Sequence, residues 1–227
     1  MLEDYRNPKW IFLGLAFVGG YSDAASFILA NTFSGHVTGN IVLTAVSVAA
    51  HDWEIFSRRV LALSLFLTGT ILSVILERIF AGKSSWPLLS VVLSLEVVLL
   101  SIAYFALTFS LAVGVKLFVS CTALAMGLQN GVWQEAGGIT VHSTYITGMT
   151  TKLLTTGAKR YISKAVPEVG PDPKIRLLSG IWLAFIAGVA LGAGLVSSFG
   201  VLGGLGVLPV LLAMLVRQSV TILRRLR

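Results

Sequence analysis

Long apolar runs, separated by short polar stretches, make up most of this chain. Six of the runs approach or exceed the roughly 20 residues that a helix needs to cross a bilayer core about 30 Å thick. They lie at about residues 10–31, 60–80, 87–109, 112–133, 177–199 and 203–221. Two further stretches, at about 36–50 and 140–158, are shorter or more polar. The pattern predicts an all-α, polytopic transmembrane helix bundle with six spans and two short or broken membrane segments.

The composition agrees with a membrane protein. The 227 residues are 56% hydrophobic and only 12% charged, whereas soluble domains are about 45–50% apolar and about 25% charged. We therefore expect the lipid bilayer to surround most of the chain. The first apolar run is longer than the core of a signal peptide, which has about 7–15 residues, so it is predicted to be an uncleaved first helix.

The net charge of +7 reflects membrane topology, and no nucleic-acid partner is expected. Lys and Arg lie almost wholly between or beyond the apolar runs, as in proteins whose positive residues stay in the cytoplasm. Arg6 and Lys9 place the N-terminus there, and Arg217 with the basic residues of 224–227 places the C-terminus there. The polar linker 159–176 is expected on the same side. These positions predict a multi-pass protein of the inner (plasma) membrane.

The number of crossings depends on the two short segments. If both cross, the positive residues left outside are Arg78 and Lys83. If both dip in and return, they are Arg58, Arg59 and Lys116. Because positive residues are disfavoured outside, two against three favours eight crossings over six crossings with two re-entrant segments.

Two polar stretches that contain glycine, residues 34–40 and 143–149, suggest that the chain is duplicated. Both hold a Thr-Gly pair, and they lie about half the chain apart. The chain is therefore predicted to be one integral membrane domain, 1–227, with tandem halves 10–109 and 112–221. Three more matches follow in the same order, at offsets that grow from 107 to 122: residues 20–23 with 127–130, 66–69 with 185–188, and Pro87 with Pro209.

Two carboxylates lie deep inside predicted spans, Asp23 in the first and Glu96 in the third. An ionised carboxylate at the centre of a span costs about 2.5–3.5 kcal/mol on insertion scales, so such residues usually face the bundle interior and serve a pathway or a proton relay. We expect Asp23 to bind substrate and either acid to couple protons. The alternative is a neutral carboxyl that only hydrogen-bonds a neighbouring helix.

The two breaks are the other candidate binding elements. Gly39 and Gly148 permit backbone geometry that exposes peptide groups. Thr38 and Thr147 are placed to cap helices that start there, which would leave N–H groups that favour an anionic ligand. The alternative is a tight loop near the membrane surface with ordinary caps. In secondary transporters with repeated halves, such discontinuous helices line a substrate site near the midplane.

Further polar residues beside the breaks join the predicted substrate site. His36 and Asn40 belong to the first break, and Asn40 is unmatched in the second, where Met149 stands. His36 has no Cys, Asp or Glu near it in sequence at a metal-ligand spacing, so no metal is expected.

The end of the fourth apolar run carries Gln129, Asn130 and Trp133, which could line a solute pocket by hydrogen bonding and stacking. Asn130 is the repeat counterpart of Asp23, similar in shape but uncharged. Trp133 is equally suited to anchoring the helix at the membrane interface.

Residues 20–27 and 35–40, with 127–130 and 146–148, resemble the bacterial YoaK family, also called the DUF1275 domain family of multi-pass membrane proteins. The resemblance covers about residues 10–221, and its most specific part is the Thr-Gly-Asn element at residues 38–40. It implies an integral membrane protein of bacterial type and says little about a biochemical role.

The sequence contains no Walker-type phosphate loop, no paired metal ligands and no Gly-x-Ser-x-Gly elbow, so we expect neither an enzyme nor a cofactor. The function predicted is a transporter or permease for an unknown small solute. The alternative is a non-transporting structural or sensing membrane protein, in which the buried polar groups only specify helix packing.

Overall fold

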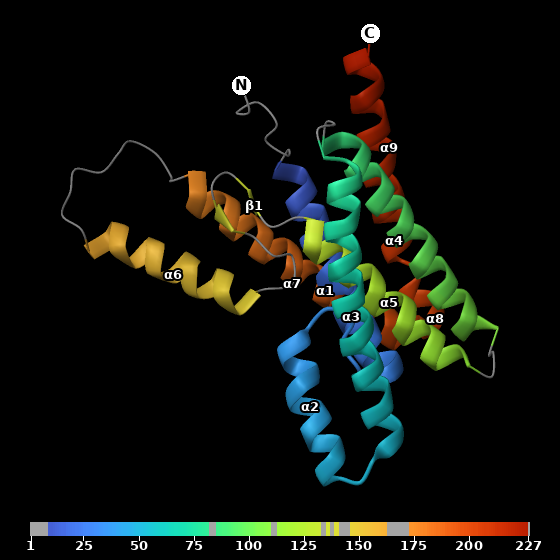
Figure 1. Cartoon of the computed structure of the whole chain (residues 1–227). Helices are drawn as coiled ribbons and strands as arrows, with labels where there is room; N and C mark the ends of the chain where they lie inside the picture. Colours follow the sequence, from blue (N-terminus) through green and yellow to red (C-terminus); the bar gives the residue numbers. More distant parts are fainter. Residues whose placement is uncertain are drawn as a thin grey trace.

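The computed structural model describes residues 9–81, 85–109, 113–132, 135–136, 139–140, 146–162 and 173–226, and most of them are helical (Figure 1). Six spans in this part of the chain are long and apolar enough to cross a bilayer. They are formed by α1 (Lys9–Ala30), α3 (Trp53–Ile79), α4 (Ser85–Thr108), α5 (Gly114–Val132), α7 (Pro173–Phe199), and α8 (Val201–Gly204) with α9 (Val207–Leu226). The all-α, multi-pass prediction is confirmed.

The remaining described elements are short. Helix α2 (Val37–Ala49) follows the first break and α6 (Ile146–Ile162) follows the second. A small antiparallel hairpin, β1 (Glu135–Ala136) with β2 (Ile139–Thr140), lies between α5 and α6 in the chain. Helices α6 and α7 extend into both ends of the stretch predicted as a linker.

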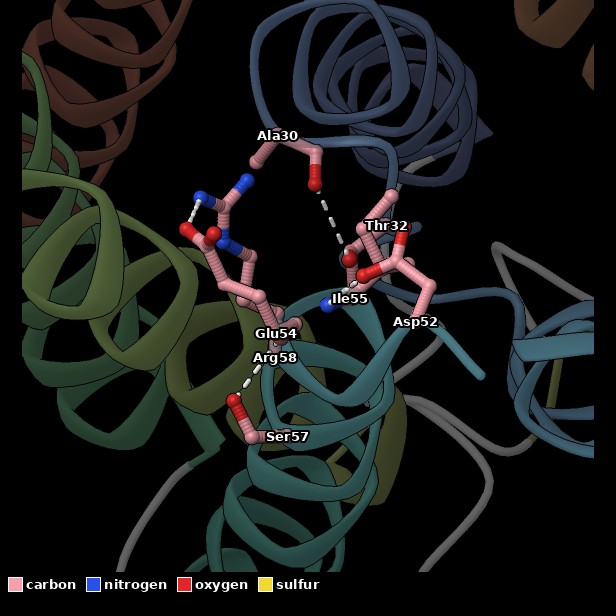
Figure 2. A network of polar contacts seen from close by, with 7 residues as sticks. All are labelled: Ala30, Thr32, Asp52, Glu54, Ile55, Ser57 and Arg58. Carbon is pink, nitrogen blue, oxygen red and sulfur yellow. Dashed lines mark hydrogen bonds and ion pairs between the residues drawn. The ribbon is translucent and has the colours of Figure 1, made fainter. Parts of the chain in front are cut away.

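Helix α3 begins seven residues earlier than the apolar pattern predicted, at Trp53 rather than at residue 60. Its first two turns mix charged and apolar residues, and Figure 2 shows the polar contacts there. The Asp52 carboxylate accepts a hydrogen bond of 3.0 Å from the Ile55 N–H, while Glu54 pairs with Arg58 one turn later. A capped N-terminus and an i,i+4 ion pair stabilise the start of a helix where charged residues interrupt the apolar run, so hydropathy alone placed the start too late.

Arg59 is buried, with 7% of its surface exposed. Its Nε donates a 3.2 Å hydrogen bond to the Asn31 carbonyl, and another guanidinium nitrogen donates to the Leu43 carbonyl and the Ser47 hydroxyl. Arg59 therefore joins α3 to α2 and to the end of α1, and it is not a loop charge. Without it, each topology leaves two positive residues outside, and the charge count no longer favours eight crossings.

The two short helices favour six crossings, because neither is among the helices long and apolar enough to cross a bilayer. The 13 residues of α2 extend only about 20 Å at 1.5 Å per residue, less than the bilayer core of about 30 Å. With six crossings each predicted half holds three spans, so the second half is inverted relative to the first. Figure 1 shows α1 beginning and α9 ending toward the same end of the molecule, as this arrangement requires.

Close helix packing follows the order of the proposed repeat. The most extensive contacts join α1 to α7 and α3 to α5. If the two predicted halves are exchanged, α1 takes the place of α5 and α3 takes the place of α7, so each pair becomes the other. At Gly20 a Cβ would collide with the Phe185 carbonyl, and at Gly127 with the Phe66 carbonyl. Gly20 matches Gly127 at an offset of 107, and Phe66 matches Phe185 at 119. Equivalent contacts at repeat positions support the duplication, which stays a prediction.

The glycine contacts can be tested by adding one methyl group. Gly20→Ala and Gly127→Ala should each lower stability by about 1–3 kcal/mol, because the new Cβ is forced against backbone of the facing helix. Gly194→Ala is the matched control, since nothing lies within 4 Å of its Cβ position and alanine favours the helix. Thermal unfolding followed by circular dichroism would measure this. Midpoints at or above wild type for Gly20→Ala and Gly127→Ala would contradict the close packing.

Topology can be tested at the two ends of α3. With six crossings and a cytoplasmic N-terminus, Glu54 faces outside and Arg78 faces the cytoplasm; both are exposed. On a Cys121→Ala background, an impermeant maleimide added to intact cells should label Glu54→Cys, and should label Arg78→Cys only after the membrane is opened. The reverse pattern would restore eight crossings.

Candidate functional site

One face of α1 is polar although it is buried. At 100° per residue, Ser22, Ser26 and Asp23 fall within an arc of about 100° on the helix. Their exposed fractions are 1%, 1% and 4% respectively. A polar stripe inside a membrane helix normally faces protein or water, and not lipid.

Helix α5 contacts α1. Leu15 lies on the same arc about two turns earlier, and its carbonyl accepts a 3.0 Å hydrogen bond from Nε2 of Gln129. Gln129 and Asn130 are both buried on α5. We call the buried polar residues of these two neighbouring helices, Ser22, Asp23, Ser26, Gln129 and Asn130, the α1–α5 seam. It lies where the two predicted halves meet, so the structure places Asp23, Gln129 and Asn130 on adjoining helices.

Asp23 closes the first break. Its Oδ1 accepts hydrogen bonds from the Ser34 hydroxyl at 3.0 Å and from the Gly35 N–H at 2.6 Å. The protein's own carboxylate thus takes the place of the anionic ligand that was expected at the start of α2. The second carboxylate oxygen, Oδ2, is buried and has no hydrogen-bond partner among the described residues.

The prediction that Thr38 caps α2 was wrong. The helix begins at Val37, and the N-cap residue is His36, whose side chain makes no capping hydrogen bond. Thr38 is exposed. Because Asp23 binds the Gly35 N–H from α1, the break does not depend on a local cap. The local sequence did not indicate this contact, because the Asp23 carboxylate lies 12 residues before the Gly35 N–H that it binds.

Asn40 holds the break from the side of α2. Its Nδ2 donates to the Phe33 carbonyl at 2.8 Å, and its Oδ1 accepts from the Phe33 N–H at 3.0 Å. The rings of Phe33 and His36 lie over Gly39, where a Cβ would approach His36 Cδ2 to 2.7 Å. Since the backbone of Phe33 occupies both ends of the Asn40 amide, we assign Asn40 a positioning role in place of the predicted contact with solute.

The second break is described only from Ile146 onward. Thr147 is exposed in the first turn of α6, Gly148 is half-buried, and Met149 is buried. The Trp182 indole N–H donates a 3.0 Å hydrogen bond to the Thr150 hydroxyl and joins α7 to α6. Trp133, predicted to line the solute site, lies outside the described residues, as do residues 143–145.

The two breaks are anchored differently. Three polar side chains hold the first: Asp23 from α1, Asn40 from α2 and Arg59 from α3. At the repeat positions of Asn40 and Arg59 stand Met149 and Leu178, whose side chains form no such hydrogen bonds. The asymmetry predicted from Asn40 therefore extends to Arg59, whereas the amide at the counterpart of Asp23 can still accept hydrogen bonds. The counterparts of the three anchors, at offsets of 107, 109 and 119, are Asn130, Met149 and Leu178.

Glu96 is a separate buried carboxylate on α4, which packs against α5 and α9. It is fully buried, and neither carboxylate oxygen has a hydrogen-bond partner among the described residues. Its counterpart at the Pro87–Pro209 offset of 122 is Gln218, also fully buried, on α9. In both buried pairs, Asp23 with Asn130 and Glu96 with Gln218, the acid lies in the first half and the amide in the second.

Sequence reasoning missed four of these residues. Ser22 and Ser26 could have been found from their i,i+4 spacing on either side of Asp23. Gln218 could have been found by extending the 122-residue offset beyond the two prolines. Arg59 gave no such signal, because its burial depends on where α2 folds.

Comparison with known proteins gives one match. Residues 11–217 match the family model described as a protein of unknown function, DUF1275. No curated protein and no solved structure matches the chain. The DUF1275 resemblance is thereby confirmed, whereas the YoaK name and the bacterial origin stay predictions.

The positioning role of Asn40 predicts a loss of stability. Asn40→Ala would leave the Phe33 N–H and carbonyl without their partner, at a cost of about 1–3 kcal/mol. Thr38→Ala is the control on the same helix, because Thr38 is exposed and should change stability by less than about 0.5 kcal/mol. An SDS titration followed by circular dichroism would compare them. If Asn40→Ala were as stable as Thr38→Ala, the amide would not hold the break.

Proposed function

We propose a function from the structure of this chain, which belongs to the DUF1275 family. In this proposal the chain is a transporter or permease for a small solute, with its site in the α1–α5 seam. It lies in the inner (plasma) membrane with both termini in the cytoplasm.

The observation that carries the proposal is the set of buried polar atoms without partners in the seam. The hydroxyls of Ser22 and Ser26 and Oδ2 of Asp23 have no hydrogen-bond partner among the described residues. In a membrane, an unsatisfied polar group costs several kcal/mol. Such groups are tolerable where water or a polar solute reaches them, and a helix bundle selected only for packing has no use for them.

The architecture supports the same function. Helix α1 ends at Ala30, the φ of 53° at Asn31 turns the chain away from the helix, and α2 starts at Val37. A helix interrupted beside a buried carboxylate is a common feature of secondary transporters built from inverted repeats. Their substrate sites lie between the halves, which is where α1 meets α5.

Proton coupling through Asp23 or Glu96 is part of the proposal. Both carboxylates are buried and each retains at least one unpartnered oxygen among the described residues. A carboxylate inside the membrane can take up a proton from one side and release it to the other. The amide counterparts Asn130 and Gln218 cannot, so any coupling would depend on the first half of the chain.

Access of water to the seam separates a transporter from a dry structural bundle. On a Cys121→Ala background, Ser26→Cys should react with a water-soluble, cationic methanethiosulfonate reagent. Ala25→Cys should not, since Ala25 is buried at nearly the same depth on another face of α1. Reaction rates would be measured in intact membranes, with equal expression checked for both variants. Equally slow labelling at both positions would favour the non-transporting, structural or sensing alternative.

A further inference from the structure

The hydroxyls of Ser22 and Ser26 behave unlike others in the described membrane helices. Ser64, Ser94 and Thr108 each donate to the carbonyl four residues earlier, at 2.8–2.9 Å. This local bond is the usual solution for a hydroxyl in an apolar helix. Ser22 and Ser26 make no such bond, although both are buried and stand one turn apart. Their oxygens are thus available to a ligand beside Asp23.

Among the described residues, no basic side chain forms an ion pair with Asp23. Arg59 is the one basic residue buried in the described part of the chain, and it donates to Asn31, Leu43 and Ser47. His36 lies near Asp23, but its ring packs on Phe33 and no hydrogen bond joins it to the carboxylate. Since an ionised carboxylate is unfavourable inside a bilayer, a positively charged ligand would stabilise it.

We infer that the seam binds a small monovalent cation, an alkali-metal ion or ammonium, through Oδ2 of Asp23 and the hydroxyl oxygens of Ser22 and Ser26. This deepens the proposed function by naming the class of ligand at the same site. Carboxylate and hydroxyl oxygens are the hard donors that such ions prefer.

The charge of the site selects a monovalent ion. Asp23 is the single carboxylate on the polar face of α1, and Glu96 lies on α4. A divalent ion would leave an uncompensated positive charge in a medium of low dielectric constant, which is costly. A proton would satisfy Asp23 alone, whereas a cation is ligated by all three side chains.

Thermal stability of the purified protein tests this without any need for transport. The midpoint would be measured in sodium, potassium, ammonium and methylammonium chloride, against N-methylglucamine chloride at equal ionic strength. At least one of the small cations should raise the midpoint, by about 3–6 °C for each tenfold rise in concentration above its dissociation constant.

Two variants should abolish the shift and still fold. In Asp23→Asn the amide oxygen can accept the bonds from Ser34 and Gly35, so the break stays closed while the charge is lost. Ser26→Ala loses no hydrogen bond within the described structure. Glu77→Gln and Ser94→Ala, on exposed positions of α3 and α4, are the matched controls and should retain the shift.

Three results would overturn the cation site: equal midpoints in all salts, a shift that survives in both Asp23→Asn and Ser26→Ala, or stabilisation by low pH that is the same in every salt. The last would assign the seam to a proton alone. A cation shift without any solute flux would refute the transporter and leave the site standing. Labelling of Ser26→Cys without a cation shift would refute the cation site and leave the transporter standing.

Discussion

The break between α1 and α2 depends on one constraint, which is that buried backbone groups need hydrogen-bond partners. Residues 32–36 leave the helical pattern, so their peptide groups need partners from outside the helix ladder. Asp23 binds the Gly35 N–H, Asn40 binds both polar groups of Phe33, and Arg59 binds the Asn31 carbonyl. Three helices thereby supply partners for the backbone of the break, and α2 is fixed relative to α1 and α3.

The same set of contacts distinguishes the halves. Glycines at equivalent positions bring α1 onto α7 and α3 onto α5 in the same manner, so the framework is close to symmetric. The polar side chains are not, because the counterparts of Asn40 and Arg59 are Met149 and Leu178.

Asp23 connects this framework to function. One of its oxygens is used for structure, while the other faces a seam with two hydroxyls that have no partners in the described structure. In the proposed site, folding stability and ligand binding would therefore depend on different atoms of one carboxylate. Replacing Asp23 by an amide keeps the first oxygen and removes the charge, which allows the two roles to be separated experimentally.

The sequence by itself determined the all-α class, the number of long apolar helices, the polar breaks and the buried position of Asp23. Those features follow from hydropathy and helix length, which are properties of local sequence. Only the tertiary structure decided which side chains are engaged: that Asn40 and Arg59 anchor the break, that Thr38 does not cap it, and that Ser22 and Ser26 make no local bond. Hydrogen bonding of a polar side chain depends on which helix faces it, and residues such as Arg59 and Asn31 are brought together across 28 positions only when the chain folds.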